Sequence, residues 1–155
     1  MAQEIELKFL VRDDSWRQAA THEIVMRQGF LCDGFERSIR VRTENQRAFL
    51  NIKSSSDGIH RLEYEYQIPL QDAQQMLARI ALQPLIEKVR YLVPAGEHHW
   101  EIDVFGGDNR GLVVAEIELP SRDAHFDRPS WLGKEVSSDF RYYNVSLRKR
   151  PYSSW

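Results

Sequence analysis

Apolar and polar residues alternate strictly along the first segment of the chain, residues Gln3–Arg12. One set of alternate positions is apolar: Ile5, Leu7, Phe9 and Val11. The positions between them carry charge: Glu4, Glu6 and Lys8. Because successive side chains of a strand point to opposite faces, this alternation predicts a β-strand with one apolar and one charged face.

The same alternation recurs along much of the chain. The further segments that show it are Arg37–Thr43, Ala48–Ser54, Leu62–Ile68, Leu85–Val93, Trp100–Phe105 and Leu112–Leu119. The turn residues Ser55-Ser56-Asp57-Gly58 separate two of them by a hairpin-sized gap. Many short strands with short gaps predict an α+β fold: an antiparallel sheet, closed or nearly so, with helices packed outside.

Two segments carry helical spacing instead. The first follows the capping run Asp13-Asp14-Ser15, where an apolar residue recurs every four positions at Trp16, Ala20 and Ile24. This spacing predicts a helix, and Gly29 is placed to end it in a left-handed cap. A second helix is predicted over Gln71–Leu82. After Pro120 the pattern weakens. We expect a loop and a short helix containing Lys134 over Ala124–Ser138, then a final strand or helical turn over Asp139–Lys149.

Length and composition limit the classes of protein. The 155 residues suffice for one domain, and a net charge of −2 argues against nucleic acid or a membrane as partner. Cys32 has no second cysteine to pair with, which fits a reducing compartment. No run of about 18 apolar residues, as a membrane span would need, occurs in the sequence. The N-terminal segment is charged, which argues against a signal peptide. We therefore expect a single cytoplasmic domain over residues 1–155. The aromatic content makes a homodimer plausible without locating an interface.

The charged faces of the predicted strands carry like charges two residues apart. The cations among them are Lys8, Arg40, Arg42, Lys53, Lys88 and Arg90. The acids are Glu4, Glu6, Glu63, Glu65, Glu101, Asp103, Glu116 and Glu118. Like charges about 4 Å apart repel by roughly 4 kcal/mol at an effective dielectric of 20. A face that merely contacts solvent would favour mixed charges, so the pattern indicates a ligand.

A compact polyanion together with divalent cations would satisfy both sets of charges. Arginine and lysine suit phosphate oxygens, and carboxylates bind hard ions such as Mg²⁺ or Mn²⁺ that bridge protein and phosphate. This combination is typical of phosphoryl transfer.

The order of the charged blocks resembles a known family. The blocks are EIELK, IRVR, NIK, EYE, EKVRY, WEIDVF, AEIEL and GKEVS, running from Glu4 to about Ser137. They are similar to those of the CYTH superfamily, the triphosphate tunnel metalloenzymes. Where a family member can carry Thr before the Ile-Lys pair, this chain has Asn51. The resemblance implies an eight-stranded antiparallel barrel whose lumen is the site, with a C-terminal helix plugging one end.

The resemblance also implies roles for individual residues. The leading metal ligands would be Glu4, Glu6, Glu116 and Glu118, while Asp103, Glu63 and Glu65 would complete a second metal site or position water. The triphosphate would be held by Lys8, Arg40, Arg42, Lys53, Lys88 and Arg90, with Lys134 as a later contact from the plugging helix. The catalytic base is left open among Glu63, Glu65 and Lys134.

These roles predict a metal-dependent hydrolase, with two Mg²⁺ or Mn²⁺ ions, that cleaves inorganic tripolyphosphate to pyrophosphate and orthophosphate. Thiamine triphosphatase and a class IV-type adenylyl cyclase stay open on the same scaffold. A non-catalytic binder of polyphosphate or nucleotide is a third alternative, although so many acids give an anion binder no advantage.

Overall fold

The computed structural model describes residues 2–34, 36–54 and 59–155, without the side chains of residues 2–4 and His60. Its strands are β1 (Ala2–Val11), β2 (His22–Asp33), β3 (Arg37–Glu44), β4 (Arg47–Ser54), β5 (His60–Ile68), β6 (Leu82–Ala95), β7 (His98–Phe105), β8 (Val113–Leu119) and β9 (Leu132–Glu135). Its α-helices are α1 (Leu70–Arg79) and α2 (Asn144–Lys149). Short 3-10 turns form η1 (Ser15–Ala19), η2 (Gly107–Asn109), η3 (Phe140–Tyr142) and η4 (Tyr152–Ser154). No helix in these ranges is long and apolar enough to cross a bilayer.

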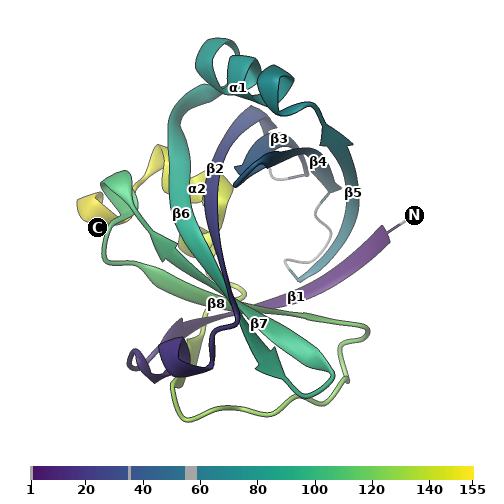
Figure 1. The fold of residues 1–155 in the computed structure, drawn as a ribbon. Coiled ribbons are helices and arrows are strands. Elements are labelled where there is room, and N and C mark those ends of the chain that lie inside the picture. The colour runs from purple at the N-terminus through teal and green to yellow at the C-terminus, as the bar shows by residue number, and fades with distance from the viewer. Residues whose placement is uncertain (1, 35, 55–58) are drawn as a thin grey trace.

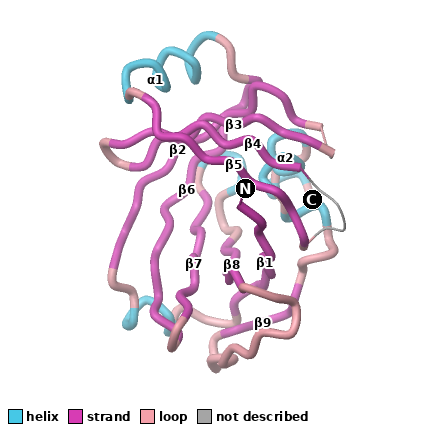
Figure 2. Tube along the Cα trace, turned by 90° about the vertical axis from the view of Figure 1, so that its right-hand side faces the viewer, coloured by secondary structure: helices cyan, strands magenta, loops and turns pink. Residues whose placement is uncertain are grey.

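The strands form one antiparallel sheet that curls into a barrel-like tunnel (Figure 1). Their order is β5-β4-β3-β2-β6-β7-β8-β1-β9, and β5 also pairs with the first half of β1, from Ala2↔Glu63 to Ile5↔His60. Each of the strands β1 to β8 therefore pairs with two neighbours around a ring, as the sequence predicts. The short strand β9 is an addition, and it pairs with the second half of β1 (Figure 2).

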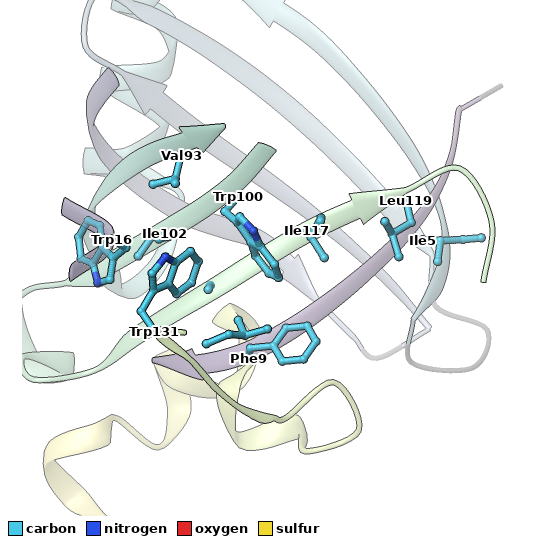
Figure 3. Packing of buried hydrophobic residues seen from close by; sticks show 11 residues of the cluster. Ile5, Phe9, Trp16, Val93, Trp100, Ile102, Ile117, Leu119 and Trp131 are labelled. Atoms are coloured by element: carbon cyan, nitrogen blue, oxygen red, sulfur yellow. The ribbon is translucent and has the colours of Figure 1, made fainter. Parts of the chain in front are cut away.

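The main hydrophobic core lies outside the ring, on the outer faces of β1, β6, β7 and β8. There Trp100 packs edge-on against Phe9 and Trp131, with ring centroids 5.7 and 5.4 Å apart (Figure 3). The apolar positions of the alternating pattern supply this cluster, which includes Ile102 and Ile117. A smaller core packs α1 on the outer faces of β3 and β4. Since the apolar faces are buried outside, the charged faces turn into the tunnel.

The inner face becomes apolar toward one end of the tunnel. Ile86, Phe105 and Val114 follow the charged positions of β6, β7 and β8 with the same two-residue period, and they cluster with Leu147 of α2. Leu147 is fully buried there. The C-terminal helix therefore plugs one end of the barrel, as the resemblance implies.

The helix predicted after Asp13-Asp14-Ser15 is wrong. Only η1 is helical there, and the chain enters β2 at His22. Along β2 the even positions from Ile24 to Phe30 are buried or half-buried while Val25 and Arg27 are exposed, which is a strand period. Pairing with β3 and β6 outweighs the four-residue spacing of Trp16, Ala20 and Ile24.

The short helix predicted around Lys134 is also wrong, because this residue lies in the strand β9. The final segment, predicted as a strand or a helical turn, forms η3 and α2.

Gly29 is needed for close packing, not for a helix cap. It lies inside β2 with no positive φ, and a Cβ there would meet Leu85 Cδ2 at 2.7 Å, Ala81 Cβ at 2.8 Å and Leu77 Cδ2 at 3.1 Å. Because overpacking forces neighbours apart, we expect Gly29→Ala to lower the free energy of unfolding by about 1–3 kcal/mol, measured by urea denaturation.

Gly106→Ala is the matched control for this prediction. A Cβ at Gly106 has its nearest neighbour, Glu87 O, at 3.8 Å, which is ordinary contact. We expect its stability to be unchanged or slightly higher. Equal losses in the two variants would contradict the close-packing role of Gly29.

Candidate functional site

A charged cavity of about 290 Å³ lies inside the barrel. Its cations are Lys8, Arg40, Arg42, Lys53, Arg61 and Arg90. Its acids are Glu6, Glu44, Glu63, Glu65, Glu101, Glu116 and Glu118. The remaining lining side chains are Phe30, Ser38, Tyr143, Asn144 and Val145. Strand pairing brings these residues from all parts of the chain to one enclosed space.

A buried lysine between two glutamates forms the centre of the site. Lys8 Nζ lies 3.1 Å from Glu6 Oε1 and 3.0 Å from Glu116 Oε1, and all three side chains are almost fully buried. The residues come from β1 and β8, where Lys8 pairs directly with Glu116. Burial by itself lowers the pKa of Lys8, but Glu116 and Glu6 outweigh it and raise that pKa. The lysine is therefore a fixed positive charge.

The two glutamates differ in pKa. Burial tends to raise the pKa of Glu6, but Lys8, Lys53 and Arg61 overcome it and hold that pKa well below its usual value. The pKa of Glu116 is raised, first by burial and then by the negative charge of Glu6. Burial and the neighbouring carboxylate thus oppose the ionised form of Glu116, and a cation bound beside it would favour that form.

Glu101 completes a cluster of three carboxylates. One carboxylate oxygen from each of Glu6, Glu101 and Glu116 lies within 4.8 Å of the others. Glu118 lines the cavity beside them, and its pKa is raised by burial and then by Glu101. This donor set of hard oxygens suits Mg²⁺ or Mn²⁺.

A second group of charges lies on β3, β4 and β5. Arg42 Nη2 donates to Glu65 Oε1 at 2.6 Å and pairs with Glu44 Oε1 at 2.8 Å, and Nη1 donates to Asn51 Oδ1 at 3.4 Å. Asn51 Nδ2 in turn donates to Glu63 at 3.2 Å. Asn51 therefore bonds Glu63 directly and is connected to Glu65 through Arg42.

Lys53 joins this second group. Its Nζ lies 3.1 Å from Glu63 Oε2, across the β4–β5 pair Lys53↔Glu63. Both side chains line the cavity. The lysine thus pairs with the same glutamate that accepts a hydrogen bond from Asn51 Nδ2.

Lys88, Arg90 and Asp103 form a buried network below the cavity. Asp103 is fully buried, and its carboxylate accepts from Lys88 Nζ at 2.7 Å and from Arg90 Nε and Nη2 at 2.7 and 3.0 Å. Burial tends to raise the pKa of Asp103, but Arg90 and Lys88 hold it well below its usual value. Burial lowers the pKa of Lys88 to about 8 despite this pairing. Arg90 alone of the three reaches the cavity lining.

The structure brings most of the predicted site residues together. Those that line the cavity are Glu6, Lys8, Arg40, Arg42, Lys53, Glu63, Glu65, Arg90, Glu116 and Glu118. Lys88 and Asp103 lie behind the lining, paired with each other. Lys134 is exposed on β9 and is not brought to the cavity. Glu4 lies in β1, but its side chain is outside the described residues.

Sequence reasoning missed Arg61, Glu44 and Tyr143. Arg61 Nη2 lies 3.3 Å from Glu6 Oε1, and its guanidinium carbon lies 5.0 Å from the centre of the Tyr143 ring. Arg61 lies two residues before Glu63, and Glu44 two residues after Arg42, so extending the strand alternation would have found both. Tyr143, which precedes α2, carried no such signal.

Comparison with known proteins gives consistent matches. The family model of the CYTH domain matches residues 2–152. A protein of Acetivibrio thermocellus named inorganic triphosphatase is 44% identical over 155 residues, which cover 100% of this chain and 99% of that protein. One of the same name from Nitrosomonas europaea is 37% identical over 151 residues, with 93% and 95% covered. The crystal structure of the inorganic triphosphatase NE1496 superposes with a TM-score of 0.66 at 34% identity, with 94% and 97% covered.

Proposed function

The chain belongs to the CYTH domain family, and from that premise we propose that it is a divalent-metal-dependent triphosphatase. Its favoured substrate is inorganic tripolyphosphate, cleaved to pyrophosphate and orthophosphate. Two full-length relatives bear the name inorganic triphosphatase, which supports this choice of activity.

One observation carries the proposal: cations and carboxylates face the same enclosed cavity of about 290 Å³. A phosphate chain is the kind of guest that such cations bind, because guanidinium and ammonium groups match phosphate oxygens. Its negative charge would be repelled by the acids unless divalent cations bound between them. Substrate and metal are therefore expected to bind together.

The carboxylate cluster fits the metal. Glu6, Glu101 and Glu116 offer three oxygens within 4.8 Å of one another, and the pKa of Glu116 is raised by burial and then by the negative charge of Glu6. These residues would hold one ion, with Glu118 lining the cavity beside them, and Glu4 stays a candidate ligand on the family resemblance alone. When bound, the ion would neutralise charge that develops on the bridging and terminal phosphate oxygens. A second ion, if bound, is assigned to Glu63 and Glu65, since Asp103 is committed to Arg90 and Lys88.

The cationic side chains position the substrate. Five arginine and lysine side chains line the cavity from β3, β4, β5 and β6, so they surround a guest from several sides: Arg40, Arg42, Lys53, Arg61 and Arg90. Fixing the phosphate chain in this way converts attack by water into an oriented, in-line reaction. Either Glu63 or Glu65 orients that water and accepts its proton, because both line the cavity, whereas Lys134 is exposed on β9 and is not part of the lining.

The lining favours inorganic phosphate chains over substrates with an organic group. Among the described lining residues, Phe30, Tyr143 and Val145 are the apolar or aromatic ones, and the others are charged or polar. A purine or a thiazole would need a larger apolar slot. Thiamine triphosphate and ATP are therefore expected to be poorer substrates.

A substrate panel tests the proposal. We expect release of orthophosphate from tripolyphosphate with Mg²⁺ or Mn²⁺, loss of that release with chelator, and a kcat/KM for ATP and thiamine triphosphate lower by at least about tenfold, or about 1.4 kcal/mol in barrier height. Faster formation of a cyclic nucleotide from ATP would indicate a cyclase instead. Tight binding of tripolyphosphate that survives chelator, with no turnover, would indicate a binding protein.

A further inference from the structure

Gln28 is a buried amide without a partner. It lies in the middle of β2 with 0% of its surface exposed, and neither Nε2 nor Oε1 has a hydrogen-bond partner among the described residues. Buried polar groups are rarely left unpaired, and an apolar side chain of the same length would fill this space without the desolvation penalty. The amide therefore indicates an interaction that the chain alone does not complete.

The strand register places this amide beside one polar side chain. Gln28 pairs with Arg42 of β3 on one side and with Ile86 of β6 on the other. Ile86 belongs to the apolar cluster under α2. Gln28 shares the inner face with Phe30, which lines the cavity. The amide thus lies at the boundary between the charged cavity and the apolar plug.

Arg42 has one unsatisfied donor that matches this amide. Its Nη2 is held by Glu44 and Glu65 and its Nη1 donates to Asn51, but Nε is buried without a partner. Side chains directly opposite in an antiparallel pair have Cβ atoms about 4.5–5.5 Å apart, so Gln28 and Arg42 are neighbours. A buried water needs two to four polar partners, and Gln28 Oε1, Gln28 Nε2 and Arg42 Nε would supply three.

We propose that Gln28 is a positioning residue, which holds the guanidinium of Arg42 through one buried water bonded to its amide and to Arg42 Nε. The water holds the guanidinium at Nε, on the side away from the cavity, while Glu44 and Glu65 hold it at Nη2, on the side that faces the cavity. Without it, the guanidinium is free to tilt toward the two glutamates and presents its charge less favourably to a phosphate chain. The effect on turnover rests on the proposed triphosphatase function.

A double-mutant cycle tests the proposal. Gln28→Met removes the amide at nearly constant length, and Arg42→Lys keeps the charge but has no Nε–H. We expect Gln28→Met to raise KM for tripolyphosphate about tenfold, or about 1.4 kcal/mol, with kcat changed less than about twofold. In the Arg42→Lys background the same change should alter KM less than about twofold, because its partner is gone. Met26→Leu, a buried apolar exchange on the same face of β2, should leave KM unchanged.

Two outcomes overturn the proposal: an unchanged KM in Gln28→Met, or the same tenfold rise in both backgrounds. If the wild type hydrolyses no triphosphate, the proposed function fails, and the same four variants are then compared by the urea concentration at the midpoint of unfolding. If Gln28→Met lowers this midpoint in the wild type but not in the Arg42→Lys background, the water bridge is supported. If Gln28→Met lowers it equally in both backgrounds, the bridge is overturned.

Discussion

Glu116→Gln is expected to lower kcat for tripolyphosphate about a hundredfold or more while the protein stays as stable at pH 7, or becomes more so. Activity falls because the variant loses one oxygen of the three-carboxylate cluster formed with Glu6 and Glu101. Stability is not expected to fall because burial and Glu6 raise the pKa of Glu116 and so oppose its ionised form, which offsets the loss of its pair with Lys8 at 3.0 Å. A group of raised pKa loses its stabilising effect as the pH rises through that pKa, and glutamine has no such titration. Lys8 keeps Glu6 as its partner at 3.1 Å.

Metal dependence of the melting temperature is the second readout for Glu116. Since a bound ion stabilises the folded state by mass action, Mg²⁺ should raise the melting temperature of the wild type and raise it less in Glu116→Gln. Glu135→Gln, at an exposed position of β9, is the control with the same change of charge and should resemble the wild type in both assays. Loss of folding in Glu116→Gln with normal turnover of the folded fraction would mean that the carboxylate is structural.

The alternation of polar and apolar positions was sufficient to predict an antiparallel sheet, closed or nearly so, and to predict which charged side chains share its inner face. A two-residue period decides which side chains share a face, so Arg40 and Arg42, or Glu63 and Glu65, had to face the same side. It also placed the cores, because the apolar sets of β1, β7 and β8 meet outside the ring. Two predicted helices were false. The first arose where Trp16, Ala20 and Ile24 happened to satisfy a helical spacing, and the second was predicted around Lys134, which lies in β9.

Depth along the tunnel could not be predicted in this way. Lys88 and Arg90 share a face, but only the plug formed by α2 decides that Arg90 reaches the cavity and Lys88 lies below it. The same holds for Asp103, which the family resemblance offered as a metal ligand and the structure pairs with both cations. Which residue of an inward-facing set meets the guest depends on long-range packing, and a local pattern carries no information about it.

The homodimer expected from the aromatic content stays a prediction.

Asp103→Asn is expected to lower the free energy of unfolding by about 3–5 kcal/mol at pH 7. The substitution removes the negative charge that compensates two buried cations, Lys88 at 2.7 Å and Arg90 at 2.7 Å. A buried charge left without its partner is among the largest single destabilising effects known for a point mutation. Urea denaturation measures the loss. Glu87→Gln is the control, because it removes the same charge from an exposed ion pair, the one between Glu87 of β6 and Arg27 of β2. It should change the free energy of unfolding by less than about 1 kcal/mol.

The pH dependence of this difference separates a buried ion pair from simple loss of packing. Arg90 and Lys88 hold the pKa of Asp103 below its unfolded value, so its stabilising effect is present above that unfolded value, about 3.9, and is lost as the pH falls through the folded pKa. The difference in unfolding free energy between wild type and Asp103→Asn should therefore be largest near pH 5–7 and shrink progressively as the pH falls below about 4, so that it is already smaller at pH 3. Measurements at pH 7, 5 and 3 check this. A difference that stays constant over this range would contradict the electrostatic origin, since a cavity or a steric defect does not titrate.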